Sequence, residues 1–268
     1  MINCKEYIEL RQQNLKDEIS KFDRAPKLCV IQVGADPASE VYVRNKRRLC
    51  EKLGIECEHE HIVDYEHLTD EDLLQVVVNK NADRTIDGVI VQLPLPKQFN
   101  SKLFTNSIVS FKDVDGFGKA SPFTPCTPKG IMDYLKHNGV DFVGKECVVI
   151  GRSDIVGKPL VNLLIEEGAT VTCCNSKTKD VIKHTKNADI VISAIGRANF
   201  FDEGYFSEGQ ILVDVGINRD EDGKLCGDIT EEAKKHAALA TTVPGGVGIL
   251  TTNALMENVV EAYRNGVW

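Results

Sequence analysis

Short apolar runs separated by segments with helical spacing constrain the fold of this chain more than any other feature. Such runs occur at residues 28–34, 88–93, 147–150, 169–173, 190–194 and 211–215, and residues 55–63 are expected to form a further strand. Helical spacing precedes the first run, over residues 4–22, and helices are expected between the next strands, over residues 39–53 and 70–81. This alternation predicts an α/β fold in which helices cover parallel sheets.

The length of 268 residues is sufficient for two packed α/β domains. We predict an N-terminal domain with a parallel sheet over residues 1–121 and a Rossmann-type domain over residues 122–249, with a cleft between them. The boundary is expected near residues 121–129, which are rich in Pro and Thr. The C-terminal segment 250–268 is expected to complete the first domain, through a helix at about 252–264.

Composition limits the kind of partner. Hydrophobic residues make up 42% of the chain and are spread evenly, and no apolar run approaches the roughly 20 residues of a membrane span. The N-terminus lacks a basic and then apolar export signal, so a cytoplasmic protein without a membrane segment is expected. The net charge of -8 argues against nucleic-acid binding, which requires surplus Lys and Arg. A small-molecule ligand is therefore expected.

Cysteine and histidine spacing gives little support to a metal site. None of the nine cysteines forms a Cys-x2-Cys pair, so we interpret them as reduced and mostly buried residues. His59 and His61 could share one face of a strand as a metal pair, but a solvated strand edge is the preferred interpretation. No metal centre is predicted.

A glycine-containing turn follows the apolar run 147–150. Gly151 and Gly157 bracket Arg152 and Ser153, where a strand must turn sharply into a helix whose N-terminal amides can face an anion. The run 169–173 is followed by residues 175–178, Asn-Ser-Lys-Thr, where a NAD site usually has Asp or Glu. Lys177 together with Arg152 suits a 2′-phosphate, so NADP is predicted as the cofactor; a plain tight turn is the alternative.

Tyr42 and Lys46 lie four residues apart, about a hundred residues before this turn. On a helix they would share one face. In short-chain dehydrogenases the cofactor turn precedes such a pair, so the reversed order here indicates a separate substrate domain. In isolation the pair would usually be a solvated helix face. The segments 92–96, 113–117 and 243–248 favour a functional interpretation, because they are rigid or glycine-rich and are poorly explained as core elements.

Taken together, these segments resemble one family, the bifunctional methylenetetrahydrofolate dehydrogenase and methenyltetrahydrofolate cyclohydrolase enzymes. The resemblance covers nearly the whole chain. It is carried by Tyr42-Val43-x2-Lys46, Val91-Gln92-Leu93-Pro94-Leu95-Pro96, residues 113–117, Pro125-Cys126-Thr127-Pro128-x-Gly130, residues 151–157, Asp214-Val215-Gly216-Ile217-Asn218, Gly227-Asp228 and Pro244-Gly245-Gly246-Val247-Gly248.

The resemblance implies oxidation of 5,10-methylenetetrahydrofolate with NADP and hydrolysis of the methenyl product to 10-formyltetrahydrofolate. It places the chain in one-carbon metabolism, including purine biosynthesis, and implies a homodimer. Lys46 would help a water attack the methenyl bridge, poised by a hydrogen bond from Gln92, while Tyr42 would orient the folate and Asp115 would anchor the pterin. The implied catalytic residues are thus Tyr42, Lys46, Gln92 and Asp115.

The resemblance also implies the residues that bind each ligand. Folate would be bound by Tyr42, Lys46, Val91, Gln92, Leu93, Asp115, Pro244, Gly245 and Gly246. NADP would be bound by Gly151, Arg152, Ser153, Ser176, Lys177 and Ile217.

One departure from the family pattern affects these expectations. Residues 117–124 are shorter than the usual loop, which contains an Asn-x-Gly-x-Leu segment. This leaves open the balance between the two activities and the strictness of NADP over NAD. The alternatives are a dehydrogenase with weak or absent cyclohydrolase activity and a folate- or nucleotide-binding regulator without turnover.

Overall fold

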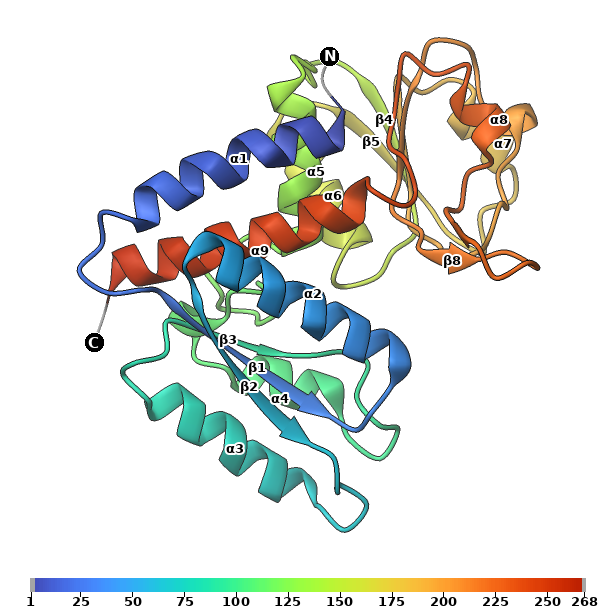
Figure 1. The fold of residues 1–268 in the computed structure, drawn as a ribbon. Coiled ribbons are helices and arrows are strands. Elements are labelled where there is room, and N and C mark those ends of the chain that lie inside the picture. Colours follow the sequence, from blue (N-terminus) through green and yellow to red (C-terminus); the bar gives the residue numbers. More distant parts are fainter. Residues whose placement is uncertain (1–2, 267–268) are drawn as a thin grey trace. The chain divides into compact units, whose positions relative to one another are not determined.

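The computed structural model describes residues 3–266, which form two compact units (Figure 1). The first unit consists of residues 10–126 and 252–266, and the second of residues 3–9 and 127–251. Each is built on a parallel sheet, so the predicted α/β class is confirmed.

The sheet of the first unit has the strand order β2-β1-β3. Its strands are β1 (Lys27–Val33), β2 (Glu56–Ile62) and β3 (Gly88–Val91), all parallel, with Leu28 opposite Cys57 on one side and Gly88 on the other. The helices are α1 (Cys4–Ile19), α2 (Pro37–Leu53), α3 (Asp70–Ala82) and α4 (Ser101–Ser107), with a 3-10 turn at Ser110–Lys112. The third run was predicted to extend to Leu93, but β3 ends at Val91.

Alternating residues of β1 fill two cores. Leu28 and Val30 face a core formed with α1, α2 and the C-terminal helix α9 (Val247–Asn265). Cys29 and Ile31 face the opposite core, formed with α3 and α4. Burial on both faces explains why this strand reads as a continuous apolar run in the sequence.

The N-terminus of α2 shows why the helix carries Tyr42 and Lys46 in a fixed orientation. Asp36 caps the helix by accepting a hydrogen bond from the Ser39 N–H at 2.8 Å, and Pro37 occupies the first turn. Gly54 ends the helix with a φ of 83°, a left-handed conformation that favours glycine. The helix thus starts two residues earlier than predicted, and its predicted end is confirmed.

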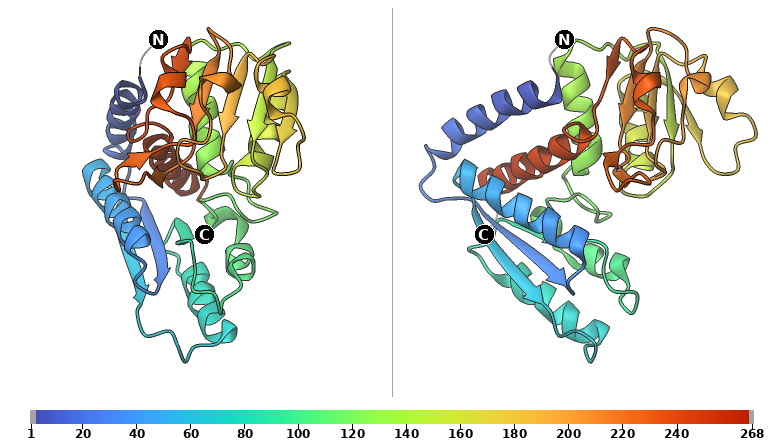
Figure 2. Two further views of the ribbon diagram at one scale, coloured as in Figure 1. Left: turned by 90° about the vertical axis from the view of Figure 1, so that its right-hand side faces the viewer. Right: turned by 45° about the vertical axis from the view of Figure 1, so that its right-hand side comes forward.

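The second unit contains a five-stranded parallel sheet with the order β10-β7-β6-β4-β5 (Figure 2). Its strands are β4 (Glu146–Ile150), β5 (Thr170–Cys174), β6 (Ile190–Ser193), β7 (Ile211–Asp214) and β10 (Leu239–Ala240). The remaining elements are α5 (Cys126–His137), α6 (Gly157–Glu166), α7 (Val181–Thr185), a 3-10 turn at Glu203–Tyr205, the antiparallel pair β8 (Asn218–Arg219) and β9 (Leu225–Cys226), and α8 (Glu231–Lys234). The chain passes from β4 to β5 and then to β6 on the other side of β4, which creates a topological switch point at β4.

The last helix begins earlier than the sequence indicated. Helix α9 starts at Val247, five residues before the predicted start at residue 252. Within the first unit its later turns lie beside α1 (Figures 1 and 2), and ion pairs of 2.8 Å join Arg11 to Glu257 and Glu18 to Arg264.

The cysteine side chains and the pair of His59 and His61 have well-defined surroundings. All nine cysteines are free, and six of them are buried. The rings of His59 and His61 stack with centroids 5.0 Å apart, and their Nε2 atoms lie 2.9 Å from Gln32 Oε1 and Gly34 O. These contacts differ from a simply solvated strand edge. Across residues 3–266, no group of three or more His, Cys, Asp or Glu is arranged to hold a metal, and no helix there is long and apolar enough to cross a membrane.

Candidate functional site

Lys46 and Gln92 form the centre of the candidate site in the first unit. The Lys46 amine donates a hydrogen bond of 2.9 Å to Gln92 Oε1, so the direction is opposite to the one expected from the family resemblance, in which Gln92 donates. Gln92 directly follows β3, and its backbone N–H donates to Ile31 O at 2.8 Å. Its side-chain amide donates to Leu93 O at 2.6 Å. Both ends of the amide are therefore fixed, which orients Oε1 toward the amine.

Asp115 adds a carboxyl group to this pair. Burial raises the pKa of Asp115 above its ordinary range, and the positive charge of Lys46 opposes that rise. The Cys126 thiol lies 3.8 Å from Asp115 Oδ1 and also donates to Val114 O at 3.3 Å. The arrangement gathers an amine, an amide and a carboxyl group, which together can bind a polar heterocycle and move protons.

The other predicted folate residues of the first unit differ in exposure. Tyr42 lies one turn before Lys46 on α2 and is 38% exposed, so its ring is accessible to a ligand. Val91 is only 2% exposed and packs in the core beneath the sheet, which leaves its backbone as the group able to contact a ligand. Leu93 is partly buried against the same core.

The shortened loop is anchored by Asp113, a residue for which no role was expected from the sequence. Its Oδ2 accepts a hydrogen bond from the Gly118 N–H at 2.7 Å, and its backbone oxygen accepts one from the Ser121 hydroxyl at 3.0 Å. The side chain is almost completely buried, and within the described residues its Oδ1 has no hydrogen-bond partner. The loop is thus closed over a carboxyl group that water does not reach.

The Asp113→Asn variant is expected to become more stable relative to wild type as the pH rises. Burial raises the pKa of Asp113 above its ordinary value of 3.8. A carboxyl group with a raised folded-state pKa contributes stability below its unfolded pKa and loses that contribution as the pH rises through its folded pKa. Asparagine does not titrate, so the difference in unfolding free energy should grow in its favour from about pH 4 upward. Urea unfolding at several pH values measures this difference, and a flat or falling difference would contradict the assignment.

Pro244, Gly245 and Gly246 lie in the second unit, directly before α9. Gly245 has a φ of 90°, and a Cβ on Gly246 would lie 2.2 Å from Thr242 O. Both positions therefore require glycine, and a side chain at either one would disturb the backbone conformation of this loop. The structure describes this loop and the Lys46 group in separate units.

The predicted dinucleotide turn lies between β4 and α6 in the second unit. Gly151 has a φ of 125°, and a Cβ there would lie 2.5 Å from Ala194 O, at the end of β6. A Cβ on Gly157 would lie 2.2 Å from Gly151 O. The Ser153 hydroxyl accepts hydrogen bonds from the N–H groups of Val156 and Gly157 at 3.2 and 3.3 Å. The turn is therefore compact and lies at the switch point, where α/β sheets bind ligands.

The cationic side chains expected for a 2′-phosphate are accessible. Arg152, Ser176 and Lys177 are exposed, and across residues 3–266 neither cation forms an ion pair. The turn after β5 is closed by its own hydrogen bonds, from the Asn175 N–H to Thr178 Oγ1 and from the Lys177 N–H to Asn175 Oδ1, both at 3.0 Å. Ser176 and Lys177 thus present an exposed hydroxyl and an exposed cation after β5, and residues 175–178 include no acidic side chain. This combination suits the 2′-phosphate of NADP.

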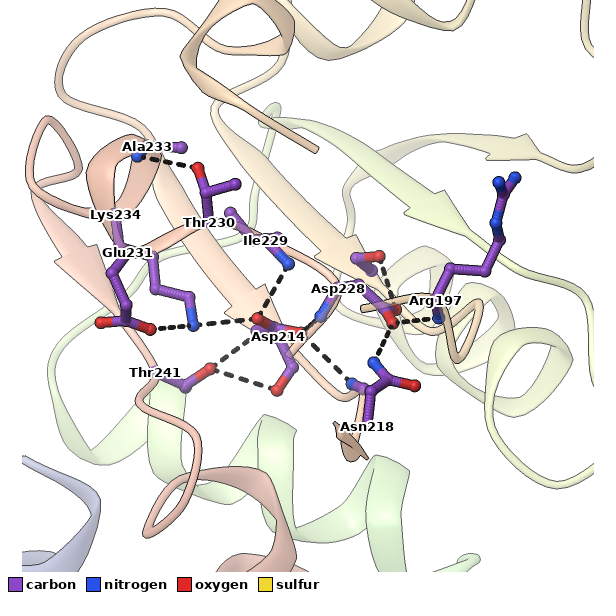
Figure 3. Close-up of polar contacts among 12 residues, drawn as sticks. Arg197, Asp214, Asn218, Asp228, Ile229, Thr230, Glu231, Ala233, Lys234 and Thr241 are labelled. Atoms are coloured by element: carbon purple, nitrogen blue, oxygen red, sulfur yellow. Dashed lines mark hydrogen bonds and ion pairs between the residues drawn. The ribbon is translucent and has the colours of Figure 1, made fainter. Parts of the chain in front are cut away.

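A buried ion pair that was not expected from the sequence joins Asp214, the last residue of β7, to Lys234 (Figure 3). Asp214 is fully buried, and its Oδ2 lies 2.9 Å from Lys234 Nζ. Its carboxylate also accepts hydrogen bonds from the N–H groups of Gly216, Asp228 and Ile229 at 3.2, 2.8 and 3.1 Å. The motif 214–218 was a possible signal for Asp214, but nothing in the spacing pointed to Lys234.

Comparison with known families accounts for both units. Residues 2–115 match the catalytic-domain model of the tetrahydrofolate dehydrogenase/cyclohydrolase family, and residues 125–267 match its NAD(P)-binding-domain model. The chain belongs to this family. The expected resemblance is therefore confirmed, and the chain is an enzyme of the tetrahydrofolate dehydrogenase/cyclohydrolase type.

Relatives in this family are similar over nearly their whole length. The bifunctional protein FolD of Agathobacter rectalis is 44% identical over 266 residues, which cover 94% of this chain and 95% of the relative. The FolD of Bacillus subtilis is also 44% identical, over 96% of this chain and 94% of its own.

Solved structures of this family have the same fold. The FolD methylenetetrahydrofolate dehydrogenase/cyclohydrolase of Campylobacter jejuni superposes with a TM-score of 0.94 at 40% identity, covering 98% of each chain. The Trypanosoma brucei FolD, solved with an NADP cofactor and an inhibitor, superposes with a TM-score of 0.92 at 30% identity, covering 100% of this chain and 98% of its own.

Proposed function

We propose that this chain oxidises 5,10-methylenetetrahydrofolate with NADP and hydrolyses the resulting 5,10-methenyltetrahydrofolate to 10-formyltetrahydrofolate. The contact between Lys46 and Gln92 carries this proposal, because it joins a proton-carrying amine to a fixed amide beside a carboxyl group. The family models and the FolD relatives supply the reaction and the substrate class.

The two reactions make different demands on the side chains. In hydrolysis, Lys46 holds and moves a proton of the water that attacks the methenyl carbon, while Gln92 keeps the amine in place. Asp115 binds the polar edge of the pterin, and the exposed ring of Tyr42 orients the folate. Oxidation depends mainly on alignment of the folate, because hydride passes directly to the bound cofactor.

The cofactor, when bound, supplies the hydride acceptor, and the residues of the dinucleotide turn are suited to hold it. Gly151 and Ser153 shape the turn for the phosphates, and Arg152, Ser176 and Lys177 would bind the 2′-phosphate. We place Ile217, which is 46% exposed, among the cofactor contacts. The NADP complex of the Trypanosoma brucei relative supports this choice of cofactor.

Arg152→Ala is expected to weaken NADP binding by about 1.5–3 kcal/mol, the value of a charge-assisted hydrogen bond. That corresponds to an increase in Kd of roughly 10- to 150-fold. Titration calorimetry with NADP measures the change, and NAD, which lacks the 2′-phosphate, should lose much less. Lys183→Ala removes an exposed cation from α7 in the same unit and serves as the matched control. Equal losses for NADP and NAD would contradict this role of Arg152.

The alternative with weak cyclohydrolase activity arose from the shortened loop. Asp113 anchors that loop through its own hydrogen bonds. The hydrogen bond between Lys46 and Gln92 is formed independently of them. We therefore favour two activities in one chain. The absorbance of methenyltetrahydrofolate, followed with NADP and with NAD, tests this directly. Formation without subsequent decay beyond the spontaneous rate would establish the alternative.

We further propose that the protein acts in the cytoplasm as a homodimer and supplies one-carbon units for purine biosynthesis. These proposals rest on the family membership. Light scattering coupled to gel filtration tests the oligomeric state.

A further inference from the structure

Asp228 is a buried carboxylate at which two loops of the second unit meet (Figure 3). Its Oδ2 accepts hydrogen bonds from the Ser193 hydroxyl at 2.9 Å and the Ile195 N–H at 2.8 Å. Its Oδ1 accepts hydrogen bonds from the Arg197 N–H at 2.8 Å and the Asn218 side-chain amide at 3.0 Å. Four donors therefore satisfy this carboxylate without a cationic side chain among them.

The four donors come from two segments that leave the same edge of the sheet. Ser193 ends β6, and Ile195 and Arg197 belong to the loop that follows it. Asn218 follows Ile217 in the segment after β7. In a parallel sheet these carboxyl ends form the ligand-binding edge. Asp228 thus ties both loops to one point.

The surrounding backbone leaves room for this arrangement only because two residues are glycines. A Cβ on Gly216 would lie 2.2 Å from Asp228 Oδ1, and a Cβ on Gly227 would lie 1.8 Å from Asp214 Oδ2. Any other residue would displace one of the carboxylates. The segment 216–218 is therefore packed directly against the carboxylate pair, while the side chain of Ile217 remains exposed.

We propose that Asp228 is a positioning residue of the cofactor site, and that its bond to Asn218 sets the position of the Ile217 segment for NADP. This inference rests on the proposed function, because it takes the edge of β6 and β7 as the cofactor site. Asp228 itself is buried and acts through the loops that it holds.

A comparison of two donors to Asp228, Ser193 and Asn218, can distinguish positioning of the cofactor segment from stabilisation of the fold alone. Ser193 lies within β6, where its strand pairs with both β4 and β7, so the sheet fixes its backbone without the side-chain bond. Asn218 lies at the start of the short pair β8 and β9, next to Ile217. Loss of the Asn218 bond frees the cofactor segment, whereas loss of the Ser193 bond removes only a buried contact.

The test compares Asn218→Ala with Ser193→Ala. We expect both variants to lower the urea midpoint of unfolding, and only Asn218→Ala to raise the Kd and KM for NADP, by about fivefold, as expected for one hydrogen bond. Ser193→Ala should keep the NADP Kd within about twofold, and the KM for folate should change little in either. Equal effects of the two variants on NADP binding would overturn the inference.

A measurement on the wild-type enzyme covers the case in which a variant does not fold. Bound NADP should slow amide hydrogen exchange in both loops, at residues 195–197 and 216–218, relative to the enzyme without NADP. Absence of protection in either loop, although NADP binds, would also overturn the inference. A wild-type enzyme that does not bind NADP would instead refute the proposed function.

Discussion

Lys46→Met should reduce cyclohydrolase activity by at least about 10²-fold, the lower end for a general acid–base group, while measurable dehydrogenase activity remains. Methionine keeps the length of the stem and removes the amine that donates to Gln92. Hydrolysis requires proton transfer to and from water, whereas hydride transfer requires mainly alignment. Methenyltetrahydrofolate should then accumulate in the coupled absorbance assay.

A second lysine on α2 provides the matched control. Lys52 is exposed and donates to Gln12 Oε1 at 2.7 Å, away from Gln92. Lys52→Met should therefore keep both activities within about twofold of wild type. If Lys46→Met hydrolyses the methenyl compound at the wild-type rate, Lys46 is not the catalytic lysine and its helix face has no role in this reaction.

Lys234→Met should destabilise the protein by about 3–5 kcal/mol, because it removes one partner of a buried ion pair. The Lys234 side chain is 6% exposed and that of Asp214 is fully buried, so the remaining carboxylate would be left without its cation. Three backbone N–H groups still reach Asp214, but they do not neutralise its charge. Urea unfolding at neutral pH measures the loss.

The neighbouring lysine, Lys235, serves as a control that distinguishes the effect of burying an ion pair from the effect of an ion pair on the surface. Lys235 pairs with Glu232 at 2.6 Å, and both side chains are well exposed. Lys235→Met should cost no more than about 1 kcal/mol, the value of a surface pair. Similar losses for the two lysines would show that the pair of Lys234 and Asp214 gains nothing from its burial.

The long elements were predictable from the sequence because their burial leaves a pattern. Strand β1 is buried on both faces and appears as an unbroken apolar run, and α2 is closed by a glycine in the left-handed conformation. Helices α4, α7 and α8 have seven, five and four residues, which is too short for a helical period to emerge. The first turn of helix α5 lies in the segment 121–129, where a domain boundary was expected. Pro128 in this segment is typical of a loop, but proline is also tolerated in the first turn of a helix.

The candidate site could be predicted in part, because some of its polar side chains lie on one face of a helix or near the end of a strand. Helical spacing placed Lys46 on one face with Tyr42, but only the family resemblance gave Lys46 and Gln92 a role. The structure brings these two side chains within 2.9 Å of each other. Asp113 and Lys234 could not be predicted, because a charged residue in a sequence carries no mark of burial. Their roles depend on which distant backbone groups enclose them.

The division of the chain into two interleaved units has a consequence for the order in which the protein can be completed. The core of the first unit joins Val43 and Leu53 to Leu255 and Val259, which a ribosome adds only after Thr251, the last residue of the second unit. The second unit has all of its residues once Thr251 has been added. Although its three strands are synthesised before those of the second unit, the first unit keeps apolar surface uncovered until α9 has been added. A chain whose synthesis stops before α9 is complete would therefore have early strands that lack their apolar cover.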